Sequence, residues 1–485
     1  MSFASRLLSS ACIARHLVLS VLGLLLATSA TQAQQPDSAA APPNILVFIA
    51  DDAGWDDFGA YGNKGIQTPS IDRLAAEGLK VERAFLTIAQ CSPSRISILT
   101  GLYPHQTGAE DLHMPLPEDQ RLVPSYLSEA GYASGHMRKT HYGPNGEAQF
   151  DWYDAVRERD YGRAMGDFLD EATGRPFFLW VGFSDPHRAY GDAPSVHDPA
   201  DVRVPPYLAD TPETRADLAQ YYDEIARMDQ NIGAMLDTLE ARGLRENTLV
   251  VFLSDNGMPF PRAKGTAYDA GIRTPLIFSW PDVIEPGTVY DSGLVSVIDL
   301  APTLLDLAGL AVPPAMEGES FRALLEEPSS YAGREQVFAE RNWHNCDEHI
   351  RAVRTARYKF ITNAYTELPL CTPADASRSP SWYSLLERKK EGTLTSEQRR
   401  LFEVPRARVE LYDLEEDPGE FTNLAGDSAY AEVALELAAL LNAWAERTSD
   451  FPPTVRRRDD NTDRVTGVKF TQENPPMYNV PEEGW

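Results

Sequence analysis

Residues 44–52 read Asn-Ile-Leu-Val-Phe-Ile-Ala-Asp-Asp, a continuous apolar run that ends in two carboxylates. Two later stretches follow the same plan. Residues 176–187 (PFFLWVGFSDPH) end in Asp-Pro-His, and residues 248–257 (TLVVFLSDNG) end in Asp-Asn-Gly. Apolar runs without alternation are typical of strands buried on both faces of a parallel or mixed sheet. The three runs therefore predict central strands of an α/β protein.

Helical patterns lie between these runs, at residues 70–78 and 213–242, and together with the strands they predict an α/β sandwich. The pattern changes after about residue 345. Residues 350–361 alternate, residues 409–413 resemble a short strand, and residues 432–447 have helical spacing. We therefore expect a catalytic domain over residues 44–345 and a smaller C-terminal α+β domain with a tail over residues 346–485.

In open α/β sheets, ligands bind beyond the carboxyl ends of the strands. The three predicted strands all present polar side chains there, which predicts one shared site containing Asp51, Asp52, His187, Asp255 and Asn256. Three carboxylates and an amide oxygen suit a hard divalent cation, Ca²⁺ before Mg²⁺. The alternative is that these side chains cap turns and helices.

The chain has 485 residues, of which 44 are Lys or Arg and 72 are Asp or Glu, so its formal net charge is −28. This charge argues against nucleic acid or an anionic membrane surface as a partner. An anionic substrate would need a locally positive site.

Residues 1–33 have the pattern of a signal peptide: a basic start, a short apolar run from Leu17 to Ala27, and a small-residue cleavage site at Thr31-Gln32-Ala33. Residues 34–43 resemble a linker. We expect an exported protein, periplasmic or secreted, without a membrane anchor after cleavage; an uncleaved anchor is the alternative.

Three cysteines remain after that cleavage, and an odd number is unusual in an exported protein. The simplest arrangement pairs Cys346 with Cys371 and leaves Cys91; three reduced thiols are the alternative.

Cys91-Ser-Pro-Ser-Arg95 opens a segment able to form a helix. Cys91 is then expected at a helix N-terminus, where unpaired N–H groups favour an anion. A buried structural thiol is the other interpretation.

Cys-x-Pro-x-Arg followed by Leu-Thr-Gly resembles the signature of the type I sulfatases. Asp51-Asp52, Lys139-Thr140-His141, Asp185-Pro186-His187 and Ser254-Asp255-Asn256-Gly257 follow in that family's order. The resemblance implies an alkaline-phosphatase-like sandwich with a large central mixed sheet. It implies that a formylglycine-generating enzyme converts Cys91 to Cα-formylglycine, whose hydrate attacks sulfur. It also implies one Ca²⁺ bound by Asp51, Asp52, Asp255, Asn256 and the residue at position 91.

Sulfate transfer requires cations against the sulfate oxygens, an activated nucleophile and a protonated leaving group. Arg95, Lys139 and Lys264 can supply the positive charge. By resemblance, His141 acts on a formylglycine hydroxyl, and His187 and Lys264 act at the leaving group. Arg262 is the alternative to Lys264.

The stretches CSPSRISILTGLYPH, FSDPHR and SDNGMPFP resemble the heparan N-sulfatase (sulfamidase) subgroup, whose bacterial members include O-sulfatases of algal polysaccharides such as ulvan. Lys264 replaces the arginine expected of a sulfamidase. We expect an O-sulfatase of a sulfated polysaccharide, or alternatively a sulfamidase of heparan-type glycans. Further residues are candidates to contact the sugar or wall the pocket: His105, His113, Arg188, Arg262, Arg273, Trp343 and His344.

Two other functions fit less well. A phosphatase or phosphonate hydrolase of the same fold would need a second metal site or an unmodified Ser or Thr nucleophile. A non-catalytic sulfoglycan-binding protein would be expected to lose Cys91, Arg95 or the metal carboxylates, and this chain has all of them.

Overall fold

The computed structural model describes residues 42–157, 160–191 and 195–453, and these belong to one compact unit. The predicted signal peptide, residues 34–41 of the predicted linker and the tail after residue 453 lie outside the described residues. Within the described ranges, no helix has both the length and the apolar composition needed to cross a bilayer.

A nine-stranded mixed sheet forms the centre of the described chain. Its spatial order is β4 (Trp152–Asp154), β3 (Ala133–Arg138), β5 (Phe177–Gly182), β1 (Asn44–Ala50), β6 (Thr248–Ser254), β7 (Arg273–Ser279), β2 (Leu79–Phe85) and β8 (Thr288–Tyr290), with β9 (Val295–Ser296) also pairing with β2. Strand β1 is parallel to β5 and to β6, whereas β7 is antiparallel to β6 and β2. The predicted mixed sheet, with all three predicted strands side by side, is confirmed.

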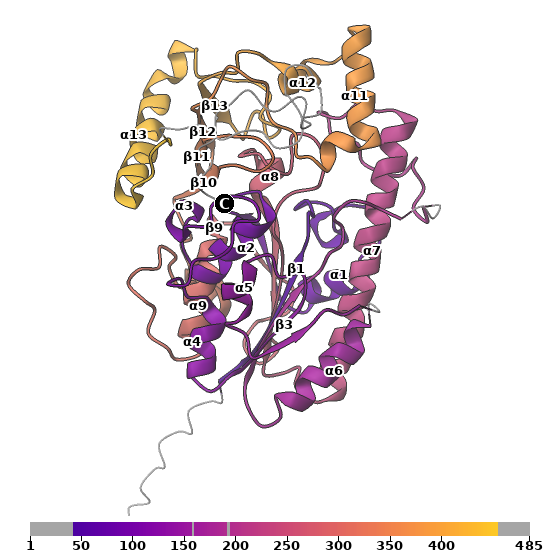
Figure 1. Ribbon diagram of the computed structural model, residues 1–485, viewed down its shortest axis with the longest axis vertical. Coiled ribbons are helices and arrows are strands. Elements are labelled where there is room, and N and C mark those ends of the chain that lie inside the picture. The colour runs from indigo at the N-terminus through magenta and orange to yellow at the C-terminus, as the bar shows by residue number, and fades with distance from the viewer. Residues whose placement is uncertain (1–41, 158–159, 192–194, 454–485) are drawn as a thin grey trace, which may run out of the picture. The chain divides into compact units, whose positions relative to one another are not determined.

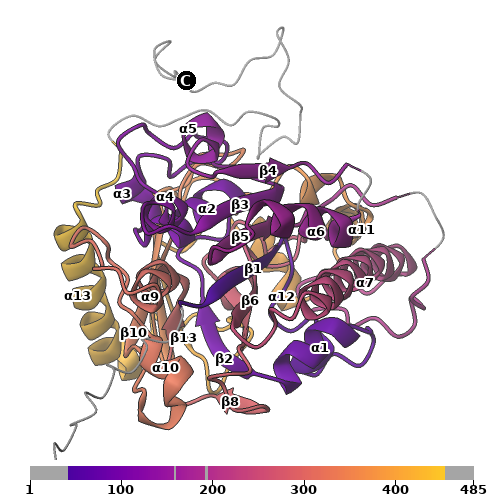
Figure 2. The same cartoon turned by 90° about the horizontal axis from the view of Figure 1, so that it is seen from below.

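Helices cover both faces of this sheet, so the architecture is a three-layer sandwich (Figures 1 and 2). One face carries α1 (Pro69–Ala76), α6 (Tyr161–Glu171) and α7 (Pro212–Ala241); the other carries α2 (Cys91–Thr100), α4 (Val123–Glu129) and α9 (Leu300–Leu307). Strand β1 explains the apolar run: Ile45, Val47 and Ile49 enter one core, and Leu46 and Phe48 enter the other. Alternate side chains of a strand point to opposite faces, so a sheet covered twice needs apolar residues at every position.

A second, four-stranded antiparallel sheet follows, in the order β10 (Gln336–Arg341), β11 (Ile350–Thr355), β12 (Tyr358–Asn363) and β13 (Val409–Asp413). The alternating segment 350–361 is thus a hairpin of two strands. Helix α13 (Ala431–Thr448) packs on this sheet through Leu437, Leu441 and Trp444. The sheet starts at Gln336, before the domain boundary predicted at residue 345, and that boundary stays a prediction.

The remaining helices are short connections, apart from α11, which packs against α7. They are α3 (Pro104–Thr107), α5 (Gly143–Glu147), α8 (Asp269–Ile272), α10 (Arg322–Glu326), α11 (Pro380–Glu391) and α12 (Ser396–Arg399).

Candidate active site

Cys91 is the first residue of α2 and is buried, with 2% of its surface exposed. Its thiol lies 3.6 Å from Asp51 Oδ1, 3.6 Å from Asp52 Oδ1 and 3.5 Å from Asn256 Oδ1. These partners follow β1 and β6, which are neighbouring parallel strands and end at the same edge of the sheet. The fold therefore brings the sequence signature and two strand-end motifs together, as the strand-end rule predicts.

Four side chains at this edge form a cluster with the chemistry of a metal site. One ligand atom from each of Asp51, Asp52, Cys91 and Asp255 lies within 4.8 Å of the others. Asn256 adds its amide oxygen beside the thiol and donates a 2.7 Å hydrogen bond to Asp52 Oδ1. Three carboxylates and an amide oxygen fit a hard divalent cation.

Three cations surround these carboxylates. Arg95 Nε donates to Asp255 Oδ2 at 2.8 Å, Lys139 Nζ pairs with Asp51, and Lys264 Nζ lies 2.7 Å from Asp52 Oδ2. Lys264 also lies 2.8 Å from a fourth carboxylate, Asp375 Oδ2. The carboxylates of this group outnumber its cations by one, so a divalent cation would make the site positive enough for an anionic substrate.

Burial and neighbouring carboxylates shift the pKa values of the two lysines in opposite directions. Burial lowers the pKa of the Lys264 ammonium, but Asp375 and Asp52 reverse this effect and leave the pKa well above its ordinary value. The same holds for Lys139: burial lowers its pKa, but Asp51 raises it by more, so that the pKa ends above its ordinary value. Burial raises the pKa of the Cys91 thiol well above its ordinary value, more than Lys139 and Lys264 lower it. Unmodified Cys91 is therefore a thiol in this setting and a poor nucleophile.

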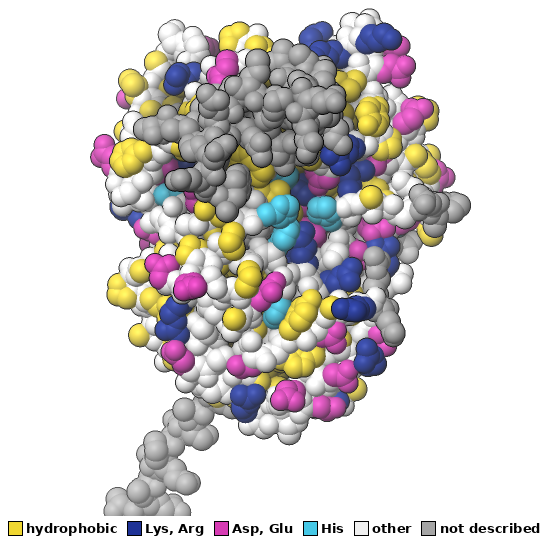
Figure 3. Space-filling view, in the orientation of Figure 1, with side chains coloured by type: hydrophobic (Ala, Val, Ile, Leu, Met, Phe, Trp, Pro, Cys, Tyr) yellow, Lys and Arg dark blue, Asp and Glu magenta, His cyan; other side chains and the backbone are white. Residues whose placement is uncertain are grey.

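A cavity of about 340 Å³ opens above Cys91. Its lining contains eight residues named from the sequence, Cys91, His113, Lys139, His141, His187, Lys264, Trp343 and His344, together with Leu112, Asn345, Ala374 and Asp375. Figure 3 shows histidine side chains gathered near the middle of the face of the molecule that it presents, close to Lys and Arg side chains. Trp343 and His344 thus line the pocket, as the sequence led us to expect.

Three of these histidines, His113, His141 and His344, have pKa values lowered mainly by burial and are therefore neutral. Burial, followed by the charge of Lys139, lowers the pKa of His141 to about 2 and also lowers the pKa of His113. Their rings lie 4.8 Å apart between centroids, and His141 Nδ1 has no hydrogen-bond partner among the described residues. A neutral imidazole facing a cavity can accept a hydrogen bond through its unprotonated ring nitrogen.

His187 follows β5 and lines the cavity beside the carboxylates of Asp52 and Asp375. Its Nε2 lies 3.8 Å from Asp52 Oδ2 and 3.7 Å from Asp375 Oδ2, and its Nδ1 contacts the carbonyl oxygen of Arg188. The ring is therefore oriented by its own backbone and presents Nε2 to the cavity.

Four residues expected to contact the sugar do not line this cavity. His105 pairs with Glu340 through a 2.5 Å contact, and Arg188 binds Asp217 with two hydrogen bonds of 2.6 and 2.9 Å. Arg188 does line a neighbouring cavity of about 300 Å³ that also contains Asp51, Lys139 and His187. Arg262 and Arg273 line a separate cavity of about 410 Å³. Of the two candidates, Lys264 rather than Arg262 contacts the carboxylate cluster.

Asp375 is the residue that sequence reasoning missed. It lies 111 positions after Lys264, in an irregular segment with no motif around it, and its only local signal is the neighbouring Cys371.

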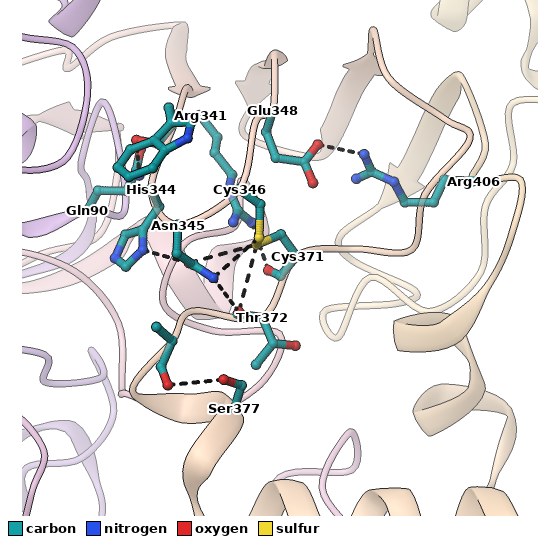
Figure 4. Close-up of a disulfide and its surroundings, with 12 residues drawn as sticks. Gln90, Arg341, His344, Asn345, Cys346, Glu348, Cys371, Thr372, Ser377 and Arg406 are labelled. Carbon is teal, nitrogen blue, oxygen red and sulfur yellow. Dashed lines mark hydrogen bonds and ion pairs between the residues drawn. A yellow bond between two sulfur atoms is a disulfide. The ribbon is translucent and has the colours of Figure 1, made fainter. Parts of the chain in front are cut away.

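A disulfide joins Cys346 to Cys371, as predicted, with a Cα–Cα distance of 6.3 Å (Figure 4). It links the two segments that form one wall of the cavity. Asn345 Nδ2 donates to the carbonyl oxygen of Thr372 at 3.4 Å, and Arg341 Nη1 donates to that of Cys371 at 3.1 Å.

Comparison with known proteins agrees with this geometry. The Sulfatase family model matches residues 43–310, and the model for the C-terminal part of N-sulphoglucosamine sulphohydrolase matches residues 263–381. The chain therefore belongs to the sulfatase family of sulfuric ester hydrolases. Within that family it is a sulfamidase-like type I sulfatase.

Two relatives and one solved structure illustrate this placement. Human N-sulphoglucosamine sulphohydrolase is 34% identical over 91% of this chain and 96% of its own length. An ulvan-active sulfatase of Formosa agariphila is 30% identical over 84% of this chain and 75% of its own. A protein solved with its substrate D-glucosamine-2-N,6-O-disulfate superposes with a TM-score of 0.65 over 85% of this chain and 99% of its own, at 20% identity, which shows a shared fold.

Proposed function

We propose that this protein hydrolyses sulfate esters of a sulfated polysaccharide or oligosaccharide, using Ca²⁺ and a formylglycine formed from Cys91. The observation that carries the proposal is the position of Cys91, at the start of α2 and within 3.6 Å of Asp51, Asp52 and Asn256. A formylglycine hydrate there would supply the nucleophilic oxygen, and Ca²⁺ would supply positive charge against the sulfate.

The chain's own residues divide the remaining work. Arg95 is buried between Asp255 and the carbonyl oxygen of Lys139, so it orients the carboxylates and Lys139. Lys139 and Lys264 reach the cavity and would balance charge on the sulfate oxygens. Neutral His141 would accept a hydrogen bond from a hydroxyl group of the side chain at position 91 and hold it in place.

The leaving group departs with the sugar and must gain a proton. His187 Nε2 and Lys264 Nζ both lie near Asp52 and Asp375 in the lining of the cavity and are the candidate donors. In the complete reaction, water replaces the sugar at sulfur: the S–O or S–N bond breaks, the sugar keeps one proton, and sulfate leaves.

A sulfamidase acting on heparan-type glycans is the second candidate. It is favoured by the match of residues 263–381 to the C-terminal part of N-sulphoglucosamine sulphohydrolase. Lys264, in place of the arginine expected of a sulfamidase, favours the O-sulfatase. Apart from Lys264, the residues discussed above would have the same roles in both candidates.

We further propose that the protein is exported. Residues 1–33 have the composition of a signal peptide, and the Cys346–Cys371 disulfide suits an oxidising compartment.

The test is sulfate release from a panel of N-sulfated heparin fragments, O-sulfated algal oligosaccharides and an aryl sulfate. The enzyme is coexpressed with a formylglycine-generating enzyme, and Cys91→Ala is the matched control. Release from the algal fragments supports the O-sulfatase, and release from N-sulfated sugar alone supports the sulfamidase. Full activity of protein whose Cys91 is unmodified by peptide mass spectrometry would refute the formylglycine mechanism.

A further inference from the structure

Asp375 is the one carboxylate among the described residues that line the cavity above Cys91. Its Oδ2 lies 2.8 Å from Lys264 Nζ and 3.7 Å from His187 Nε2. These are the two groups proposed to act at the leaving group. A carboxylate that contacts both can set where each of them points.

Lys264 has two carboxylate partners that differ in what else they bind. Asp52 belongs to the proposed metal cluster, so in the loaded enzyme its oxygens would be shared with the cation. Asp375 lies outside that four-residue cluster; its carboxylate groups instead with Asp52 and His187, and its Oδ2 contacts both Lys264 and His187. The lysine side chain is a flexible chain with one charged end. When Asp52 is shared with the cation, the contact with Asp375 therefore decides where the Lys264 ammonium group lies.

Asp375 is itself held in place from several directions. Its Oδ1 accepts a 2.8 Å hydrogen bond from the backbone N–H of Ala376, which begins a short 3₁₀ turn. Four residues earlier, Cys371 is bonded to Cys346 and accepts a hydrogen bond from Arg341. Figure 4 shows how Asn345, Cys346, Cys371 and Thr372 converge at this junction. The segment is therefore fixed to the strand-end loop that carries Trp343 and His344.

We propose that Asp375 is a positioning residue, which directs Lys264 and His187 toward the leaving group, and that the Cys346–Cys371 disulfide fixes Asp375 for this task. The inference rests on the proposed function, because it assigns a role within that reaction. Asp375 would act through these two side chains, with which its Oδ2 is in contact.

The experiment compares Asp375→Ala and Asp375→Glu with the wild type. Asp413→Ala is the matched control, since Asp413 pairs with Arg357 through a 2.7 Å contact and does not line the cavity. We measure kcat and KM on a glycan sulfate and on an activated aryl sulfate. For Asp375→Ala, we expect kcat on the glycan sulfate to fall roughly 100-fold, the magnitude of general-acid catalysis. KM and the aryl-sulfate rate should change little, Asp375→Glu should recover part of the loss, and Asp413→Ala should behave as the wild type.

The double variant Cys346→Ser/Cys371→Ser tests the second half of the proposal with Asp375 intact. We expect the same selective loss of kcat on the glycan sulfate, smaller than for Asp375→Ala, with Ca²⁺ affinity unchanged. A double variant that folds and keeps the wild-type kcat on both substrates would remove the disulfide from the proposal.

Two results would overturn the role of Asp375. One is a rise in KM without loss of kcat, which would make Asp375 a sugar-binding residue. The other is an equal loss on both substrates, which would make its role structural. Crystal structures of wild type and Asp375→Ala locate Lys264 Nζ without any turnover; an unmoved Nζ would refute the positioning role. A wild type that releases no sulfate contradicts the proposed function instead. The position of Lys264 Nζ in the two crystal structures would then still show whether Asp375 positions Lys264.

Discussion

Lys264 Nζ lies 2.7 Å from Asp52 Oδ2 and 2.8 Å from Asp375 Oδ2, so one ammonium group joins the end of β1 to the segment between β12 and β13. Asp52 belongs to the cluster suited to a metal ion, and Asp375 belongs to the wall of the cavity. The site at this edge of the large sheet is thus completed by Asp375, which lies between β12 and β13 of the small sheet.

Replacing Asn256 by Ala should weaken Ca²⁺ binding roughly 10- to 100-fold, because the change removes an oxygen ligand and the hydrogen bond that orients Asp52. Unlike the aspartates, Asn256 leaves no buried cation unpaired when it is removed. Calcium titration of metal-stripped protein by calorimetry measures the effect. Asn423→Ala is the control, because Asn423 Oδ1 accepts a hydrogen bond from the backbone N–H of Leu411, away from the proposed metal site. Equal Ca²⁺ affinity in the wild type and Asn256→Ala would exclude Asn256 as a ligand.

His187→Ala should reduce kcat on a glycan sulfate by roughly 100-fold, because a poor leaving group needs its proton. An activated aryl sulfate needs little assistance and should lose far less. His197→Ala is a suitable control, since His197 pairs with Asp223 and does not line the cavity. Steady-state rates on both substrates decide the matter: equal losses would contradict the assignment of His187 as the acid.

Gly265 and Gly309 share a left-handed backbone with φ of 73° but differ in their surroundings. A Cβ at Gly265 would lie 3.0 Å from the Pro373 ring, two residues before Asp375, whereas a Cβ at Gly309 would meet nothing within 4 Å. Alanine at either position should cost about 1–2 kcal/mol of unfolding free energy through backbone strain. Only Gly265→Ala should also lower kcat. Denaturant unfolding and kinetics of both variants check this, and a normal kcat in Gly265→Ala would show that the Pro373 segment adapts.

Stability should fall in acid partly because of His136, which is buried beneath Tyr153, Phe150 and Tyr142. Burial lowers its pKa to about 4 from an ordinary 6.5. The unfolded chain therefore binds a proton that the folded chain does not, and this contribution to stability is present above pH 6.5 and is lost as pH falls toward 4. The slope is about 1.4 kcal/mol per pH unit in that window.

The matched variant His136→Phe keeps an aromatic ring and removes the titration. Between pH 7 and pH 4 it should lose about 3 kcal/mol less unfolding free energy than the wild type. Denaturant unfolding at several pH values measures the difference. Parallel pH profiles for the two proteins would show that His136 is not the titrating group.

Several parts of the fold and site follow from short stretches of the sequence. Apolar runs that end near Asp51, His187 and Asp255 predicted three buried strands with one shared site, and the structure places these strands side by side as β5, β1 and β6. The rule works because parallel strands deliver their carboxyl ends to one edge of the sheet. The segment 350–361 was less informative: alternation predicted strand but not the turn between β11 and β12.

Residue type alone misplaced the candidates for sugar contact. Arg262 and His105 are polar and close in sequence to the motifs, yet Arg262 packs on Tyr268 and Phe421, and His105 pairs with Glu340. Partners for such side chains come from distant segments, and no local pattern reports them.

By itself, the sequence determined the strand-end carboxylates, the position of Cys91 at a helix start, and the pairing candidates Cys346 and Cys371, because each depends on a few neighbouring residues. Only the tertiary structure decided that Lys264 rather than Arg262 reaches the cluster, and that Asp375 meets it there. Those contacts depend on how the small sheet and the disulfide-linked segment pack against the large sheet, across 111 residues of chain.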